Sequence, residues 1–239
     1  MMSSSSPSGA HLRLLQLSTI VLLSTMAFFF GNTGEAFSDA TLAGKTVVVL
    51  GDSITKGVRA GVAPEEIFSA RLEKALKGEG NDVVVNNQGI GGERTDQALK
   101  RLATDVLSQK PAVVVVMYGT NDSYIDIGRS EPRITADEFE ANLREIVRQL
   151  ESQGTRVVLM TAPRWGDKAT PNGAGENPNS QLEKYLERTR LVAESSKLSL
   201  IDHYRLWSEA RSQGRDISAW MTDECHPNPE GHSQLAAAI

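Results

Sequence analysis

Five short runs of consecutive apolar, mostly β-branched residues constrain the fold of this chain more than any other feature. Turn-forming residues bound each run, and stretches with apolar residues at helical spacing separate most of them. Continuous rather than alternating Val, Ile and Leu is typical of strands buried on both faces, as in parallel sheets covered by helices. The runs are residues 46–50, 83–85, 112–117, 156–160 and 198–201, and the helical stretches are 64–77, 96–109, 136–153 and 181–196.

Strand and helix alternation of this kind predicts an α/β protein, a three-layer α/β/α sandwich with a five-stranded parallel sheet. The length of 239 residues suits one well-buried core, and two full-sized domains would both be unusually small. In such open sheets ligands bind beyond the carboxyl ends of the strands. We therefore expect the chemistry in the residues that follow each strand.

The first 36 residues differ from the rest. Residues 14–30 are almost wholly apolar, follow Arg13, and give way to small and turn-forming residues with Gly34 and Ala36 at suitable positions for cleavage. This pattern predicts either a signal peptide removed after Ala36 or an uncleaved N-terminal membrane anchor. We expect the protein to be exported, secreted or periplasmic, or else membrane-anchored through residues 14–30, with a hydrolase domain over residues 37–239.

The net charge and the cysteine content limit which partners and which covalent cross-links we expect. The net charge of −5 offers no basic field for a phosphate backbone, so we expect no nucleic-acid partner. The single cysteine, Cys225, cannot form an intrachain disulfide. The exported domain must therefore rely on its core alone for stability.

Four polar or Gly-rich segments follow the predicted strands or lie near the C-terminus. Each has an ordinary structural explanation, because Ser53 could cap a helix, the glycines could form turns, and a lone histidine is more often structural than catalytic. Asp223, three residues before His226, could nevertheless bend back and accept a proton from the imidazole. The segments read Gly51-Asp52-Ser53, Asn87-x-Gly89-x-x-Gly92, Gly119-x-Asn121-Asp122 and Asp223-x-x-His226-Pro227.

In this order and at these positions the four segments resemble the conserved blocks of the SGNH hydrolase superfamily, the GDSL-type esterases and lipases. The resemblance covers residues 45–239 and implies the flavodoxin-like SGNH hydrolase fold. It also implies Ser53 as nucleophile, His226 as general base and Asp223 as the residue that orients the imidazole. The oxyanion hole would consist of the backbone N–H groups of Ser53 and Gly92 and the side-chain amide of Asn121.

The resemblance leaves several residues with other roles. Gly91 stays an alternative to Gly92 as the oxyanion donor, because the two glycines are adjacent. We interpret Asp52 and Asp122 as supports of the loops, and His203 and His232 as structural. No cofactor is required, and the histidines and carboxylates show no zinc-ligand spacing such as His-Glu-x-x-His.

The substrate is only partly indicated. Aromatic residues make up 5% of the chain, and no long apolar segment suits a lid for an oil surface. This favours a small-molecule or carbohydrate ester, a short acyl group on a polar alcohol. A lysophospholipase or thioesterase activity and a non-catalytic carbohydrate-binding module are the alternatives. The polar segment 165–180 is either a surface loop or a substrate-facing rim, and Trp165 could stack on a sugar or pack on its neighbours.

Overall fold

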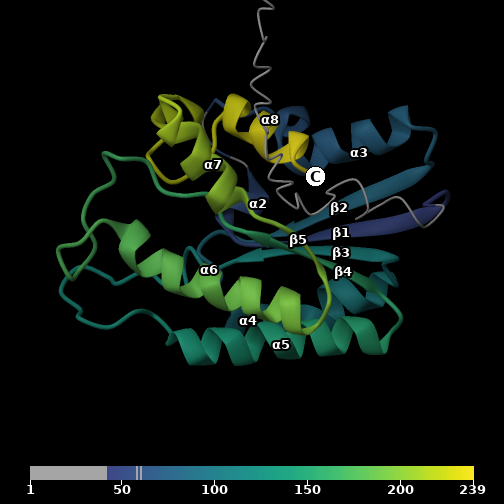
Figure 1. Cartoon of the computed structure of the whole chain (residues 1–239). Coiled ribbons are helices and arrows are strands. Elements are labelled where there is room, and N and C mark those ends of the chain that lie inside the picture. The colour runs from purple at the N-terminus through teal and green to yellow at the C-terminus, as the bar shows by residue number, and fades with distance from the viewer. Residues whose placement is uncertain (1–41, 58, 60) are drawn as a thin grey trace, which may run out of the picture. The chain divides into compact units, whose positions relative to one another are not determined.

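The computed structural model describes residues 42–57, 59 and 61–239. The expected signal or anchor segment, residues 1–36, therefore lies outside the described part. A five-stranded parallel sheet with the order β2-β1-β3-β4-β5 forms the centre of the domain (Figure 1). The strands are β1 (Lys45–Gly51), β2 (Val83–Gly89), β3 (Val113–Tyr118), β4 (Arg156–Thr161) and β5 (Ser199–Ile201).

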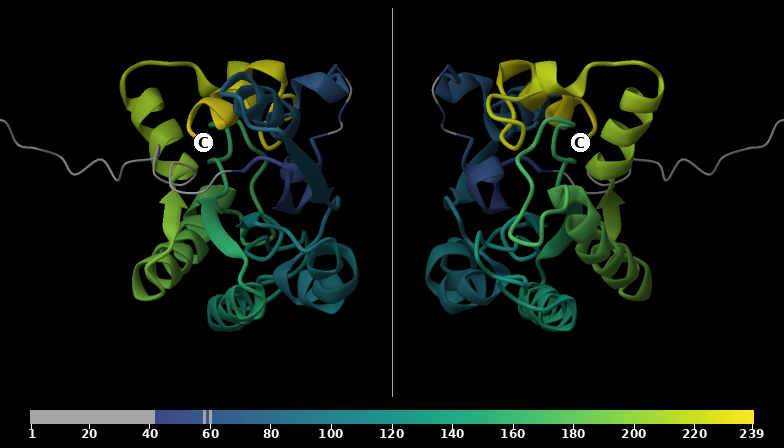
Figure 2. Two further views of the ribbon diagram at one scale, coloured as in Figure 1. Left: turned by 90° about the vertical axis from the view of Figure 1, so that its right-hand side faces the viewer. Right: turned by 90° about the vertical axis from the view of Figure 1, so that its left-hand side faces the viewer.

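Helices cover both faces of this sheet, as the end-on views of Figure 2 show. The helices α3 (Phe68–Gly78), α7 (His203–Ser212) and α8 (Pro229–Ala237) lie on one face, and α4 (Thr95–Arg101), α5 (Ala136–Ser152) and α6 (Pro178–Ser195) on the other (Figure 1). Short helical segments complete the fold: α2 (Ser53–Lys56), η1 (Pro64–Glu66), η2 (Leu102–Val106), η3 (Leu107–Gln109) and η4 (Ile217–Trp220). The predicted three-layer α/β/α sandwich is confirmed, and its strand order is the flavodoxin-like one.

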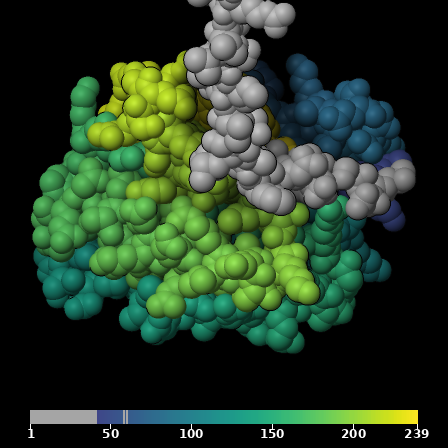
Figure 3. Space-filling view, viewed as in Figure 1, coloured from purple at the N-terminus to yellow at the C-terminus, as the bar shows by residue number. Residues whose placement is uncertain are grey.

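The side chains of β1 show why a continuous apolar run was required. Val47 and Val49 pack with Phe68 in the core beneath α3, whereas Val48 and Leu50 pack in the core beneath α4, α5 and α6. Successive side chains of a strand point to opposite faces, so a strand covered on both sides needs apolar residues at every position. In the space-filling view the side chains of α6 and α7, green and yellow-green, cover much of one side of the domain (Figure 3).

Three regions of the chain depart from the expectations. The helix expected over residues 96–109 is regular only to Arg101 and continues as the wider π turn η2. Ala98, Leu102 and Val106 are all buried, and their strict four-residue spacing exceeds the 3.6 residues of an α-helical turn. A widened turn keeps all three on the core face.

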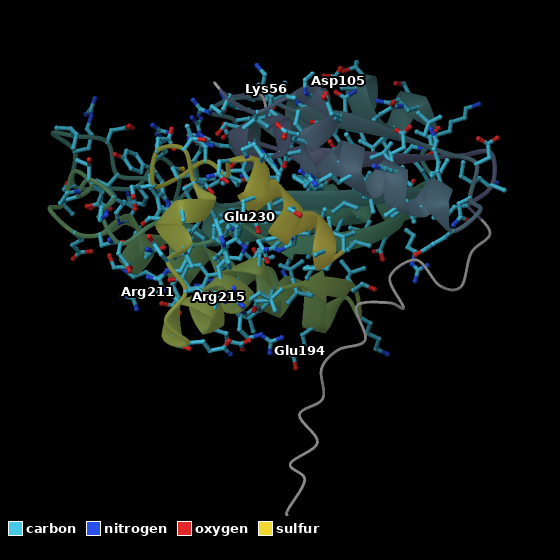
Figure 4. The ribbon with its side chains drawn as sticks, turned by 90° about the horizontal axis from the view of Figure 1, so that it is seen from above. Lys56, Asp105, Glu194, Arg211, Arg215 and Glu230 are labelled. Atoms are coloured by element: carbon cyan, nitrogen blue, oxygen red, sulfur yellow. The ribbon has the colours of Figure 1, made fainter. Side chains whose placement is uncertain are left out.

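The other two departures concern β2 and the C-terminal region. β2 lies at the edge of the sheet with Val84 half exposed, so it is not buried on both faces. The short helices α7 and α8 lack a long apolar repeat and were not expected from the sequence. Seen from above, α8 with Glu230 lies over the sheet (Figure 4), and α3 and α8 pack against each other.

Within the described residues, we find no helix with the length and apolar character needed to cross a membrane.

Candidate active site

Ser53 is the first residue of α2 and comes directly after β1, beyond the carboxyl end of that strand. The side chain of Asp52 caps this short helix by accepting a hydrogen bond from the N–H of Ile54 at 2.8 Å. Asn87, in β2, donates its amide to the carbonyl oxygen of Thr55 at 2.7 Å and so holds the same helix from the neighbouring strand. The Ser53 backbone is thereby fixed to the sheet.

Ser53, His226 and Asp223 form one chain of hydrogen bonds. Ser53 Oγ lies 2.9 Å from His226 Nε2, although 173 positions separate the two residues. His226 Nδ1 lies 2.9 Å from both carboxylate oxygens of Asp223. With Nδ1 donating to Asp223, Nε2 is free to accept a proton from the serine hydroxyl. The structure thus brings together the nucleophile, base and orienting residue that the sequence analysis predicted, and their catalytic roles remain our proposal.

The turn that carries Asp223 and His226 depends on Glu224. Glu224 has a φ of +64°, a left-handed conformation that few residues other than glycine adopt. Its carbonyl oxygen accepts a hydrogen bond from Gly166 N–H at 2.8 Å, and its carboxylate accepts hydrogen bonds from Ser218 Oγ at 2.9 Å and Lys168 N–H at 3.2 Å. A Cβ on Gly166 would lie 1.8 Å from the Glu224 carboxylate. The turn is therefore clamped to residues 166–168.

Two charged groups act on the imidazole of His226. Burial lowers its pKa, contact with Asp223 raises it in part, and the nearby Arg59 guanidinium lowers it, so the pKa lies below the usual range. Arg59 Nη2 also contacts Nε2, the same atom that faces Ser53. Burial raises the pKa of Asp223, but hydrogen bonds from the backbone and ring of His226 outweigh it and hold this pKa below its usual range. At neutral pH the pair is therefore a neutral imidazole beside a carboxylate.

Asn121 follows β3 and is held by contacts other than those that hold His226. Its Nδ2 donates to Asp52 Oδ2 at 3.3 Å and to the carbonyl oxygen of Glu93 at 3.2 Å, while its Oδ1 accepts from Arg133 Nη1 at 3.1 Å. Because the Arg133 contact uses Oδ1, it fixes which end of the amide carries the donors. Asn121 and Ser53 line the same cavity.

The two glycines of the second block differ in conformation. Gly92 has a φ of +76°, and Gly91 has no positive φ. Only Gly92 therefore occupies a conformation that favours glycine. Neither residue is among those that line the cavity at Ser53, so the role of Gly92 as an oxyanion donor stays a prediction.

Buried hydrogen bonds anchor the loop that carries Gly92. The Glu93 carboxylate accepts hydrogen bonds from Arg101 Nε and Nη2 and from Tyr118 Oη, each at 2.6 Å. The Glu93 side chain is 4% exposed and that of Arg101 13% exposed. None of these three residues was singled out from the sequence, because Glu93 and Arg101 suggest surface charges there and Tyr118 ends an apolar strand.

Asp122 joins the third block to the second. Its carboxylate accepts hydrogen bonds from Thr95 N–H at 2.8 Å, Thr95 Oγ1 at 2.7 Å and Gly119 N–H at 3.1 Å. Burial raises the pKa of Asp122 to about 6 and that of Asp52 to about 7. These contacts fit the expected role of Asp52 and Asp122 as supports of the loops.

A cavity of about 150 Å³ opens above Ser53. Trp165 stacks on Tyr124 with ring centroids 5.8 Å apart, and the Arg133 guanidinium lies 5.2 Å from the centroid of Tyr124. Trp165 therefore packs on its neighbour and also lines the cavity. The lining residues are Ser53, Thr120, Asn121, Tyr124, Arg133, Trp165, Cys225 and His226. Segment 165–180 thus reaches the site through Trp165, and its last three residues already belong to α6.

His203, His232 and Cys225 are buried. His203 and His232 are fully buried, and burial lowers the pKa of each to about 4. Burial raises the pKa of the Cys225 thiol well above its usual range, which makes a thiolate nucleophile unfavourable. Among residues 42–57, 59 and 61–239, no group of three or more His, Cys, Asp and Glu side chains is placed to hold a metal ion.

Relatives of the chain are recognisable by sequence and structure. Uncharacterized lipoprotein YqeF of Bacillus subtilis is 30% identical over 142 residues, which cover 59% of this chain and 55% of YqeF, so the chain spans about half of that relative. The acetylxylan esterase of Geobacillus stearothermophilus is 28% identical over 82% of this chain and 92% of its own length. The crystal structure of the acetyl xylan esterase AlAXEase superimposes with a TM-score of 0.68 at 26% identity, covering 81% of this chain and 96% of that one.

The sequence of most of the domain also matches a known protein family. The GDSL-like Lipase/Acylhydrolase family matches residues 49–234, a span that runs from the end of β1 into α8 and contains Ser53, Asn121, Asp223 and His226. The solved structure named above has the same fold over most of its length. The chain therefore belongs to the GDSL-like lipase/acylhydrolase family of ester hydrolases, within the SGNH hydrolase superfamily.

Proposed function

We propose that this chain is a serine esterase that removes a short acyl group from a polar or carbohydrate alcohol. The observation that carries the proposal is the chain of 2.9 Å contacts from Ser53 through His226 to Asp223 at the floor of a cavity of about 150 Å³. A serine hydroxyl is a poor nucleophile at neutral pH and needs an adjacent base. His226 is such a base, because its lowered pKa keeps Nε2 unprotonated.

The reaction proceeds in two similar halves. Ser53 Oγ attacks the ester carbonyl while His226 takes the hydroxyl proton, and Asp223 stabilises the imidazolium that forms. Negative charge builds on the carbonyl oxygen, and the Asn121 amide with the N–H groups of Ser53 and Gly92 stabilises it. His226 returns the proton to the departing alcohol, leaving an acyl-serine. Water then attacks this ester by the same steps and releases the acid.

The size and walls of the cavity support a short acyl group. Trp165 and Tyr124 form a packed aromatic wall on one side of this small cavity. Two relatives are named acetylxylan esterase and isoamyl acetate-hydrolyzing esterase 1 homolog, and both names refer to an acetyl ester. These names and the cavity favour acetate as the acyl group.

The activity is tested with a fluorophosphonate probe and a panel of esters. We expect Ser53 to be labelled in the wild type and no labelling in Ser53→Ala. Acetylated sugars and p-nitrophenyl acetate should be hydrolysed faster than p-nitrophenyl esters of longer chains. Preferred hydrolysis of a lysophospholipid or a long-chain thioester would replace the short-acyl proposal. Absence of labelling and of hydrolysis in the folded protein would leave the non-catalytic binding module.

We also propose that residues 1–36 direct export of a hydrolase domain that spans residues 37–239. The apolar run at residues 14–30 after Arg13 supports this, and so does the lipoprotein among the relatives. Mass spectrometry of the protein from the outside fraction should give an N-terminus at residue 37. Full-length protein retained in the membrane fraction would indicate the anchor instead, and full-length protein in the cytoplasmic fraction would contradict export.

A further inference from the structure

A second and larger cavity shares one lining residue, Arg133, with the cavity at Ser53. Its volume is about 470 Å³, within the range of about 300–1,000 Å³ that is usual for small-molecule sites. Arg133 lines both cavities, and its guanidinium donates to the Asn121 amide at 3.1 Å. The remaining lining residues are Arg94, Asp126 and the segment 129–132. A molecule bound here would therefore contact Arg133, the residue that donates to the amide of the proposed oxyanion hole.

The charges that line this cavity nearly balance. Three guanidinium groups face two carboxylates, those of Asp126 and Glu131. Arg133 is paired with Asp126 at 2.7 Å, and Arg94 with Asp96 at 2.9 Å. An anion would lie against the carboxylates and a cation against the arginines. The lining therefore favours a neutral occupant.

Three polar side chains of the cavity are left for that occupant. The guanidinium of Arg129, the hydroxyl of Ser130 and the carboxylate of Glu131 form no side-chain hydrogen bond or ion pair with the residues that the structure describes. All three are exposed and line the cavity. A sugar hydroxyl can accept from Arg129 and donate to Glu131, because it is both acceptor and donor. An apolar chain would cover these groups without replacing their bonds to water, at a cost in free energy.

We propose that this cavity is the subsite for the alcohol half of the substrate and that it binds a neutral, hydroxyl-rich alcohol, a carbohydrate, through Arg129 and Glu131. The inference rests on the proposed esterase function and assigns the larger, polar half of the ester to the larger cavity. The smaller cavity at Ser53 then holds the acyl group. Arg129 and Glu131 are specificity-determining residues that act on binding rather than on the chemical step.

The test compares two acetate esters that share the acyl group and differ in the alcohol. The rates of hydrolysis of an acetylated xylo-disaccharide and of cyclohexylmethyl acetate are measured with the wild type, Arg129→Ala and Glu131→Gln. Losing a charge-assisted hydrogen bond should raise KM for the disaccharide ester, and the ratio of its kcat/KM to that of cyclohexylmethyl acetate should fall about tenfold in each variant. The control is Arg215→Ala, an exposed arginine that lines neither cavity (Figure 4).

An unchanged ratio in both variants, or an equal fall in Arg215→Ala, would overturn the proposal. Binding is also measured without turnover, by saturation-transfer NMR of the deacetylated disaccharide with Ser53→Ala. A signal that disappears in Ser53→Ala/Arg129→Ala supports the subsite even if the esterase activity is absent. A signal that persists unchanged in the double variant contradicts the subsite even if the esterase activity is present.

Discussion

The two sides of Ser53, the proposed nucleophile, are held in different ways. On the oxyanion side, the loops after β1, β2 and β3 are joined by buried hydrogen bonds, with a Glu93 side chain that is only 4% exposed. On the base side, Asp223 is 45% exposed, and its turn is held by contacts with residues 166–168 and Ser218. The proposed oxyanion donors thus lie on loops that buried hydrogen bonds join at the sheet, and the proposed base lies on a turn that is held by residues outside the sheet.

This difference has an energetic reason. Charge stabilisation in the transition state requires donors that do not reorganise, and buried, fully bonded networks are rigid. A base must instead exchange its proton with substrate and water in every cycle, and the 15% exposed His226 side chain is compatible with this role. We therefore expect substitutions on the oxyanion side to affect stability and rate together. Substitutions that support the base should affect rate and pH dependence with less effect on stability.

The largest effect on the rate is expected from substitution of Ser53 or His226. Ser53→Ala and His226→Ala should each lower kcat by about three orders of magnitude or more, and the double variant should be scarcely worse, because the two groups act in one step. Steady-state kinetics with p-nitrophenyl acetate measures this. Losses that multiply in the double variant would show that the 2.9 Å contact is not used in catalysis.

Glu93→Ala tests the contribution of the buried hydrogen bonds on the oxyanion side. This change removes the buried carboxylate that pairs with Arg101 and leaves Asp105 at 3.5 Å as its other ion-pair partner, so we expect a loss of about 1–3 kcal/mol in the free energy of unfolding. Urea denaturation measures the loss. The control is Glu209→Ala, which removes an exposed ion pair with Arg205 at 3.9 Å and should cost less than about 1 kcal/mol. Equal losses in the two variants would remove the distinction between the buried network and the surface.

The oxyanion donor itself is tested by Asn121→Ala. We expect kcat to fall roughly 10²- to 10³-fold with little change in KM, since the contact strengthens only in the transition state. Steady-state kinetics with p-nitrophenyl acetate separates the two constants. A rise in KM at constant kcat would instead identify Asn121 as a residue that binds the ground state of the substrate.

The sequence predicted the sheet well because its signal is local. A run such as residues 46–50 has apolar side chains at every position, and a strand covered on both faces requires this. The block residues Ser53, Asn121, Asp223 and His226 were found because a family resemblance marks them individually. The strand ends then account for their proximity in space.

The supports of the site were missed because their signal is not local. Glu93 and Arg101 are charged residues in polar surroundings, and only the packing of α4 and β3 shows that they are buried against Tyr118. Glu224 is likewise an ordinary acidic residue in sequence, and its role depends on Gly166, 58 positions earlier in the chain. Burial and long-range partners are properties of the fold and cannot be read from spacing.

Substitutions of Glu224 test whether its contacts support the turn that carries the proposed base. Glu224→Ala loses the carboxylate clamp and keeps the unfavourable left-handed backbone, so we expect kcat to fall about tenfold while the protein stays folded. Glu224→Gly removes the backbone strain but also lacks the carboxylate, and Glu224→Gln restores one acceptor. If the clamp matters, Gly should resemble Ala and Gln should recover part of the rate. Wild-type activity in Glu224→Gly would show that only the backbone conformation is needed.

A surface substitution controls for the Glu224 variants. Glu230→Ala removes an exposed carboxylate on α8 and should leave kcat unchanged (Figure 4).

The smallest effect is expected from Arg59, whose charge reaches His226 from the exposed side. Because the pKa of His226 is lowered, kcat/KM should rise with pH through one ionisation with a midpoint below the reference value of about 6.5. A nearby cation disfavours the imidazolium, so Arg59→Ala should raise the pKa of His226 and move the midpoint upward by less than about one unit. Activity at pH values below the midpoint should therefore fall in the variant and recover at higher pH.

Salt screens exposed charges, so the difference in midpoint between wild type and Arg59→Ala should shrink at 1 M NaCl. The rate deficit of Asn121→Ala should persist in the same salt, since the contacts on that side are partly buried. A midpoint that moves downward in Arg59→Ala would show that the guanidinium favours the imidazolium, which is the opposite of the effect expected from its charge.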